Sequence, residues 1–266
     1  MNDNINLQAS NLLWTSWQDR AVIDELPQTL RPATRPQGYA VQALLEQHSS
    51  KPLFGWKIAA TSTAGQQHIG VDGPLAGRIL AERVREDGAT IGLAGNRMRV
   101  AECEFAFRMG RDLVPRSVAY TIAETMAAVT SLHPAIEIPD SRYRQFEKVG
   151  AAQLIADNAC ADLMILGAKT TCNWRSLDLA KHAVTATIER AAATITHYHG
   201  IGSNVLGDPR IALTWLVNEL SGIGITLKAG QAVITGTCLT PIAIAPGDTL
   251  RASFGPIGDI SAQFAA

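Results

Sequence analysis

The sequence predicts an α+β protein in which many short strands form the core, helices lie outside them, and a small helical lobe precedes them. Up to about Glu46, apolar residues recur three to four positions apart, which is the period of a helix. From Lys51 onwards, short runs with two-residue alternation or β-branched residues are separated by turns that contain glycine and proline. The chain has 266 residues, 47% of them hydrophobic, which is enough to bury a sizeable core. We therefore expect a helical lobe over residues 1–50 and one larger domain over residues 51–266.

Each expected element follows from a local pattern. Pro36 suits the first turn of a helix, and the RPATR segment at residues 31–35 separates that helix from the one before it. The β-branched residues between Ala180 and His199 favour two antiparallel strands that turn near Glu189 to Ala192. Helices are expected over residues 10–26, 36–45, 116–130, 148–156 and 209–220, with a short one within 61–70. Strands are expected over residues 51–60, 71–80, 97–113, 131–139, 161–167, 180–199, 232–235, 249–254 and 259–264.

Composition and charge point to a small molecule as the partner. The formal net charge is −1 and no run of basic residues occurs, so nothing favours nucleic acid or an anionic membrane surface. The N-terminal MNDNINLQAS is neither basic nor apolar, and no stretch approaches the roughly 18 apolar residues of a membrane-spanning helix. The cysteines form no CxxC pair and have no disulfide-like spacing, which is typical of a reducing compartment. We therefore expect a cytoplasmic protein.

The segment Arg97–Leu113, RMRVAECEFAFRMGRDL, places two carboxylates in an otherwise apolar run. In a strand, Glu102 and Glu104 share one face with Val100, while Cys103 lies on the opposite face with its apolar neighbours. Two like charges side by side on a mostly buried surface repel each other and lose hydration, at a cost of several kcal/mol per ion. The simplest compensation is a bound divalent cation.

A third carboxylate, Glu137, lies at the centre of the short β-type run PAIEIP. Three carboxylates with room for water or substrate oxygens form an oxygen-only site, which favours magnesium or manganese. The alternative is that Glu102 and Glu104 lie on a solvated edge strand and Glu137 lies at the mouth of a loop. The residues alone leave both interpretations open.

Other polar residues stand at strand positions that suit a site. Lys57 is a lone cation in an alternating strand, either at the surface or held near the carboxylates. Arg142 follows Glu137 and could pair with it, bind a substrate carboxylate or lie at the surface. Lys169 lies just beyond a buried strand, where it could meet an anionic group, and Thr237 follows a glycine, which suits carboxylate binding.

His197 and His199 would share a face of the last strand in the 180–199 region, so a two-histidine metal site is conceivable. An exposed pair on an edge strand is the interpretation that we favour.

Five blocks of the chain resemble one known family. They are GWKIAATSTAGQQHIGV, AECEFAFRMGRDL, PAIEIPDSRY, IADNACADLMILG and LKAGQAVITGTCLTPIAIAPGDTL, and they run from about Tyr39 to Phe264. In order and spacing they resemble the 2-oxopent-4-enoate hydratase and 4-oxalocrotonate decarboxylase family, within the fumarylacetoacetate hydrolase superfamily.

The resemblance implies a fold, a metal and a set of roles. The fold would be the fumarylacetoacetase C-terminal-like rolled mixed β-sheet or barrel, with surrounding helices. Glu102, Glu104 and Glu137 would hold magnesium or manganese, which chelates the carboxylate and 2-oxo oxygen of a pyruvyl-type substrate, and Lys57 would face that substrate. A homo-oligomer would be expected, with a complex with a related pathway enzyme as a further possibility.

Two positions depart from the family pattern. The hydratases carry an aspartate directly after the proline that matches Pro74, whereas this chain has Leu75, which can neither accept nor donate a proton. Asp72 and His68 are the candidates to replace it. Cys160 stands where a serine hydroxyl is usual, and sulfur is the poorer hydrogen-bond partner.

The predicted function is a divalent-metal-dependent hydratase, a lyase, acting on 2-hydroxypenta-2,4-dienoate-like 2-oxo acids of aromatic catabolism. Residues 51–266 would form its metal-binding catalytic domain. A decarboxylase of an oxalocrotonate-type diacid, or a tautomerase of a related 2-oxo acid, is the first alternative. A non-catalytic homologue that acts as a partner subunit is the alternative of another class.

Overall fold

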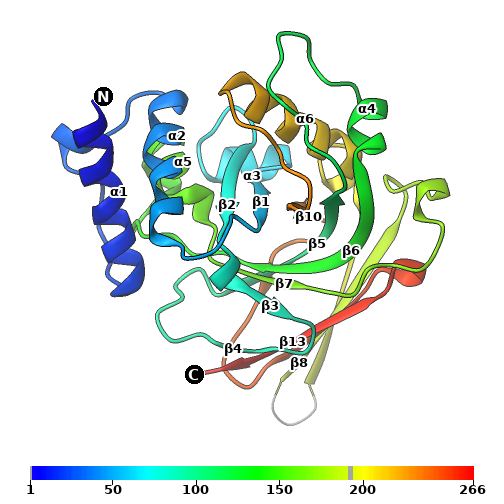
Figure 1. The fold of residues 1–266 in the computed structure, drawn as a ribbon. Coiled ribbons are helices and arrows are strands. Elements are labelled where there is room, and N and C mark those ends of the chain that lie inside the picture. Colours follow the sequence, from blue (N-terminus) through cyan, green and yellow to red (C-terminus); the bar gives the residue numbers. More distant parts are fainter. Residues whose placement is uncertain (1, 191–193) are drawn as a thin grey trace.

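Two β-sheets organise the computed structural model, which describes residues 2–190 and 194–266 (Figure 1). The strands are β1 Gly55–Ala59, β2 Leu75–Ile79, β3 Val84–Glu86, β4 Thr90–Gly92, β5 Val100–Met109, β6 Val129–Ile138, β7 Leu163–Leu166, β8 Ala183–Arg190, β9 Thr194–Ile201, β10 Ala232–Thr237, β11 Ile242–Ala243, β12 Thr249–Ser253 and β13 Asp259–Ala265. The larger sheet has the order β2-β1-β10-β5-β6-β7-β3, with β11 also paired to β5. The smaller sheet has the order β4-β13-β12-β8-β9.

Helices cover the sheets from outside and form the N-terminal region (Figure 1). The α-helices are α1 Asp3–Gln18, α2 Arg35–Ala43, α3 Thr63–His68, α4 Ile122–Ala127, α5 Ala151–Ala156 and α6 Pro209–Gly222. Short 3₁₀ turns are η1 Gln28–Leu30, η2 Leu44–His48, η3 Ala81–Arg83, η4 Phe146–Lys148, η5 Asn158–Cys160, η6 Trp174–Ser176, η7 Gly202–Asn204 and η8 Gly255–Ile257.

The first two helices are capped by residues that suit their positions. The Asn2 side chain accepts a hydrogen bond from the amide of Ile5, and Thr34 caps α2, which has a proline in its first turn. A separate apolar cluster that includes Leu13, Val41 and Tyr143 joins α1 and α2 to the segment around α5. The lobe boundary near residue 50 stays a prediction.

The larger sheet curls so that its inner face is enclosed (Figure 1). Strands β2 and β7 are not neighbours in the sheet, yet Ile79 of β2 and Met164 of β7 belong to one small buried cluster with Ala106 of β5. Phe105 and Phe107, on the opposite face of β5, belong to the main core instead. The two-residue alternation expected for this segment is therefore present, and the Glu102–Glu104 face of β5 is the enclosed one.

The smaller sheet contains the hairpin expected between residues 180 and 199. Strands β8 and β9 pair antiparallel from Ala183↔Ile201 to Arg190↔Thr194, which confirms two antiparallel strands. The expected turn near Glu189 to Ala192 lies partly outside the described residues.

Several expected helices are shorter in the structure. Of residues 116–130 only α4 is α-helical, because Thr121 caps it through a capping box and β6 already begins at Val129. The helix expected over residues 148–156 begins at Ala151, since Gly150 adopts a φ of +82°, which a helix cannot include. Within residues 2–190 and 194–266, no helix combines the length and the apolar character needed to cross a membrane.

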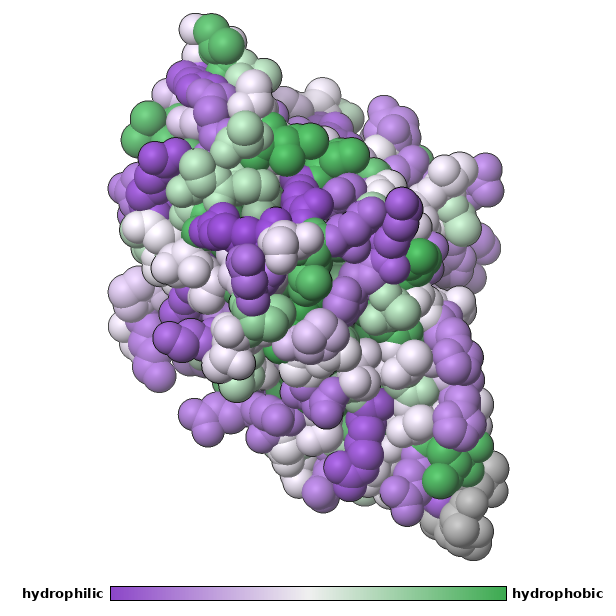
Figure 2. Space-filling model, turned by 90° about the vertical axis from the view of Figure 1, so that its right-hand side faces the viewer, coloured by the Kyte–Doolittle hydropathy of each residue, from purple (hydrophilic) through white to green (hydrophobic). Residues whose placement is uncertain are grey.

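The surface carries apolar residues in small separate patches. Figure 2 shows green areas divided by purple and white ones on the face that it presents. Among the large apolar side chains that are exposed, Val114, Val118 and Ile122 belong to the segment around the start of α4.

Candidate metal centre

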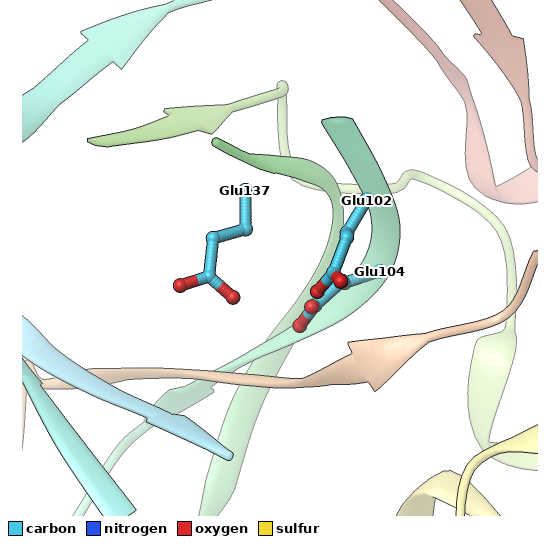
Figure 3. Close-up of side chains that lie close together, drawn as sticks. All are labelled: Glu102, Glu104 and Glu137. Atoms are coloured by element: carbon cyan, nitrogen blue, oxygen red, sulfur yellow. The ribbon is translucent and has the colours of Figure 1, made fainter. Parts of the chain in front are cut away.

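The pairing of β5 with β6 brings three carboxylates together. Glu102 is the direct cross-strand partner of Glu137, and Glu104 lies two residues further along the same face of β5. Each of the three offers an oxygen atom, and these oxygens lie within 4.8 Å of one another. Figure 3 shows the side chains from β5 and β6 pointing into one shared space.

The centre is buried and its oxygens are incompletely bonded. Glu104 and Glu137 are 0% and 2% exposed, whereas Glu102 is half-buried and faces a cavity. The backbone amide of Gly236 donates a 2.7 Å hydrogen bond to Glu104 Oε2. Glu104 Oε1 and Glu137 Oε2 are buried without any hydrogen-bond partner, and such atoms are costly unless something else binds them.

Burial raises the pKa of all three carboxyl groups, since it penalises the charged form. The pKa of Glu137 rises to about 7, with the nearby Lys57 acting against the rise. For Glu104, the neighbouring Glu137 and Glu102 raise the pKa further. A hard divalent cation would hold all three groups ionised and bind the two orphaned oxygens, so these residues fit a magnesium-type site.

Lys57 is the cation of the centre. Its Nζ lies 3.1 Å from Glu137 Oε1 and donates a 3.0 Å hydrogen bond to the carbonyl oxygen of Ala159. Burial alone would lower the pKa of Lys57, but the carboxylates, Glu137 foremost, outweigh it and raise the pKa above its usual value. Lys57 therefore stands in the centre as an ammonium.

A left-handed turn presents the Ala159 carbonyl to Lys57. Asn158, Ala159 and Cys160 in η5 have φ values of +58°, +50° and +60°, which cost about 1–3 kcal/mol each for such residues. The Asn158 side chain fixes the turn because it bonds both the amide and the carbonyl of Arg78, at 2.6 and 2.8 Å. Burial raises the pKa of Cys160 to about 12, so its side chain is a thiol.

The centre opens into one cavity of about 970 Å³. Lys57 and Glu102 line its polar end together with Thr237, and His68 of α3 and Leu75 of β2 line it elsewhere. The Thr237 hydroxyl donates a 2.8 Å hydrogen bond to the carbonyl of Leu239, so its proton is already engaged. Leu75 is fully buried and pairs with Ala59, two residues along β1 from the Lys57↔Gly77 pair.

Comparison with known proteins decides the family. Residues 50–265 match the family model described as fumarylacetoacetate (FAA) hydrolase C-terminal. The chain belongs to this family. Because this family consists of enzymes, the chain is an enzyme.

Hydratases are among the most similar relatives in the FAA hydrolase family. The TodF product hydratase of Pseudomonas putida F1 is 29% identical over 261 residues, which cover 97% of this chain and 94% of that protein. The 2-keto-4-pentenoate hydratase 1 of Dechloromonas aromatica is 31% identical over 260 residues, covering 97% and 96%. The 2-hydroxyhexa-2,4-dienoate hydratase of Comamonas testosteroni is 33% identical over 222 residues, covering 83% and 81%. By name all three are lyases.

A solved structure confirms the family fold. The 4-oxalocrotonate decarboxylase from Pseudomonas putida G7, complexed with magnesium and adipate, superposes with a TM-score of 0.87. The match covers 99% of this chain and 98% of that one at 23% identity. The predicted α+β fold, with a curled sheet and surrounding helices, is confirmed as the FAA hydrolase fold.

Three residues predicted for the site lie elsewhere in this FAA hydrolase family member. The Asp72 side chain is 89% exposed and lies 3.5 Å from Arg35, outside the cavity. Lys169 is exposed beyond β7 and does not line the cavity either. The remaining residue, Arg142, is buried and paired with Asp157, and it also bonds the carbonyls of Asp140 and Ala161. Its guanidinium holds the loop after β6, so of the three alternatives for Arg142 the pairing with Glu137 and the surface position are wrong. Arg142 does not line the cavity, and its role in binding a substrate carboxylate stays a prediction.

The histidine pair has the exposed placement on an edge strand that the sequence favours. His197 and His199 are exposed on β9. In the part of the chain that the structure describes, the three glutamates are the one cluster of three or more acidic, histidine or cysteine residues whose ligand atoms lie close enough to hold a metal ion.

Sequence patterns did not indicate the backbone groups that support the centre. The amide of Gly236 and the carbonyl of Ala159 act through the main chain, which every residue shares. Gly77 is required for a different reason: a Cβ there would lie 2.4 Å from the Asn158 carbonyl and 2.9 Å from Lys57 Cγ. A glycine opposite a buried lysine in paired strands is the signal that could have found Gly77.

Proposed function

We propose that the chain is a divalent-metal-dependent hydratase for 2-hydroxypenta-2,4-dienoate-like 2-oxo acids of aromatic catabolism. The observation that carries the proposal is the charge balance of the centre. Three carboxylates, two of them buried and one half-buried, when ionised face one ammonium, which leaves two negative charges for a divalent cation to neutralise. Magnesium is the proposed ion and manganese the alternative, because both favour oxygen ligands.

Glu102, Glu104 and Glu137 would hold the ion. When bound, it supplies Lewis-acid polarisation of the 2-oxo oxygen and a second point of attachment for the substrate carboxylate. The chain's own groups fix this arrangement, since Gly236 orients Glu104 and Lys57 orients Glu137. Glu102 faces the cavity, so the substrate would approach from its side of the centre.

Hydration requires one group to take a proton from water and another to deliver a proton to carbon. The Lys57 Nζ already donates to Glu137 Oε1 and to the Ala159 carbonyl, so it is the proposed proton donor. His68 lines the cavity and is the remaining imidazole at which a proton from water could be held. We therefore propose His68, rather than Asp72, as the base that replaces the aspartate absent at Leu75.

A decarboxylase or tautomerase is the second candidate, and Leu75 is the observation that favours it. A leucine beside Lys57 cannot activate water, whereas loss of a carboxylate or a shift of a proton along the substrate needs no added water. The same lysine and carboxylates would serve these reactions.

Rate measurements with two acids separate the candidates. The chain is assayed with 2-hydroxypentadienoate and with oxalocrotonate, in excess magnesium and again after chelation with EDTA. We expect metal-dependent consumption of the pentadienoate without release of carbon dioxide. Carbon dioxide released from oxalocrotonate would instead identify the decarboxylase. No metal-dependent product from either acid would support the non-catalytic homologue.

Assembly and location stay predictions. We propose a cytoplasmic homo-oligomer, alone or in complex with a related pathway enzyme. Light scattering on the purified chain would measure the mass of the assembly. The mass of a monomer would contradict the proposed homo-oligomer.

A further inference from the structure

A second cavity lies apart from the metal centre, between the end of α1 and the loop that leads into β5. Its volume is about 260 Å³. A water molecule takes up about 30 Å³ in the liquid, so this cavity has room for a ligand of several heavy atoms. Among the described residues, none lines both this cavity and the one at the metal centre. The proposed reaction therefore leaves the second cavity unexplained.

Four arginines line this second cavity, and they come from segments that are far apart in the sequence. Arg20 follows α1, Arg83 lies in η3, Arg97 precedes β5 and Arg142 follows β6. The guanidinium groups of Arg83 and Arg142 both lie over the Trp17 ring, 4.5 and 4.7 Å from its centroid. Burial, and then the neighbouring arginines, lower the pKa of Arg83, because like charges at close range disfavour the charged form. The fold thus gathers cations at this point.

Three carboxylates balance most of this positive charge. Arg83 Nη1 lies 3.3 Å from Asp162 Oδ1, and Arg142 is paired with Asp157 behind the cavity. Asp140 also lines the cavity, but its Oδ1 accepts hydrogen bonds of 2.9 and 3.3 Å from two backbone amides. Four arginines against three aspartates leave one positive charge in excess.

Arg20 and Arg97 are the two arginines of the cavity without a carboxylate partner. Within residues 2–190 and 194–266 neither forms an ion pair, and the Arg97 guanidinium makes only long hydrogen bonds, of 3.5 and 3.3 Å, to carbonyl oxygens. Arg20 has a φ of +54°, an unfavourable conformation that is often kept where a side chain has a function. Gly95 leaves room for that side chain, because a Cβ there would lie 2.3 Å from Arg20 Cδ.

We propose that this second cavity binds a small multivalent oxyanion, with a phosphate group as the best fit, and that Arg20 and Arg97 bind it. Arginine presents its N–H donors in a planar fork that matches phosphate oxygens, and such charge-assisted hydrogen bonds are about twice as strong as neutral ones. The anion would join the end of α1 to the loop before β5 and balance the excess positive charge. The site goes beyond the proposed function, because neither the metal ion nor the 2-oxo acid takes part in it.

Binding of inorganic phosphate to the metal-free chain tests the proposal without any turnover. Metal ions are removed with a chelating resin, so that neither magnesium nor a soluble chelator competes, and titration calorimetry is run at constant ionic strength in sodium chloride. We expect one saturable site for phosphate. Tighter binding of phosphate than of glycerol 3-phosphate would support the free ion as the ligand, and the reverse order would support a phosphorylated small molecule. The absence of saturable binding of either would overturn the proposal.

Substitutions of single arginines locate the site. Arg20→Gln and Arg97→Gln each remove one exposed guanidinium and should weaken phosphate binding by about tenfold or more, as expected for the loss of a hydrogen bond to a charged group. Arg20→Lys keeps the charge but loses the planar fork, so its affinity should lie between those of the parent and Arg20→Gln. Unchanged affinity in both glutamine variants would place the anion elsewhere and overturn the proposal.

The matched control is Arg251→Gln, which removes an exposed arginine of β12 outside this cavity. It changes the net charge by the same amount, but screening by salt weakens distant charges, so the phosphate affinity should change by less than about twofold. A loss in Arg251→Gln as large as that in Arg20→Gln would show that net charge, rather than this cavity, attracts the ion. That result would also overturn the proposal.

Discussion

At the scale of single residues, main-chain groups hold the charged side chains of the metal centre in place. Gly236 has a φ of +99° and points its amide at Glu104, and its missing side chain leaves room for Thr61. The Ala159 carbonyl lies in a left-handed turn and holds Lys57 by accepting a hydrogen bond from its Nζ. Such supporting contacts typically change metal affinity by about 10–100-fold when they are lost.

Gly236→Ala is therefore expected to weaken magnesium binding by at least tenfold. A Cβ at Gly236 would lie 2.1 Å from Thr61 Oγ1, so the strand end must move and take the amide away from Glu104. Gly247→Ala is the matched control, because Gly247 has a φ of +91° with nothing within 4 Å of its Cβ position. Calorimetric titration with magnesium measures both variants, and equal affinities would argue that the amide is dispensable.

Leu75→Asp is expected to raise the hydration rate on 2-hydroxypentadienoate by at least tenfold. The new carboxylate would lie on the strand next to Lys57, two residue pairs along the β1–β2 ladder, and general acid–base groups contribute about 10²–10⁴-fold. The control is Leu75→Asn. Asparagine has the shape of aspartate but no titratable group, so this variant should give no increase in the hydration rate. If Leu75→Asp gains nothing either, His68 or another chemistry supplies the proton transfer that we propose for this position.

At the scale of elements, the register of paired strands brings the carboxylates of the site together. The sequence predicted the strand face that carries two of them. The alternation through Glu102 and Glu104 separates two faces because side chains in a strand alternate with a period of two. The turn at residues 158–160 could not be predicted in the same way, since Asn158, Ala159 and Cys160 carry no glycine to mark a positive φ.

Loop paths were the other feature that local patterns did not determine. Arg142 follows β6 by a few residues, so its sequence position suggested the site. The loop instead turns its guanidinium onto Asp157, which also accepts hydrogen bonds from the Ser141 hydroxyl and the Arg142 amide. This ion pair ties the end of β6 to the turn that presents the Ala159 carbonyl.

Arg142→Met is accordingly expected to lower the free energy of unfolding by about 3–5 kcal/mol, because it leaves the Asp157 charge buried without its cation. The control is Arg144→Met, which removes an exposed pair with Asp24 and should change stability by no more than about 0.5 kcal/mol. Urea unfolding measures both. Equal free energies of unfolding for the two variants would mean that the Arg142–Asp157 pair does not stabilise the fold. A role of Arg142 in substrate binding would then have to be tested.

At the scale of the whole molecule, the folded chain encloses three carboxyl groups and one lysine at one point of its interior. The curled sheet buries Glu104 and Glu137 almost completely, and Lys57 balances only one of the three acids. Burial of unpaired charge opposes folding, so the metal-free protein stores an unfavourable term that a cation would remove. Metal binding and global stability should therefore be linked.

Magnesium at about a hundredfold its dissociation constant is expected to stabilise the chain by about 2.7 kcal/mol. In a protein of this size that corresponds to a rise in melting temperature of about 5–10 °C, which EDTA should reverse. Glu104→Gln should abolish most of the rise, yet be no less stable than the parent in EDTA, because the amide fills the same space without a buried charge. Glu86→Gln, at an exposed glutamate of β3, should keep the full rise. Thermal unfolding followed by circular dichroism measures the three chains with magnesium and in EDTA. A Glu104→Gln chain that still gained the parent's full increment from magnesium would show that the ion binds outside the three-glutamate centre.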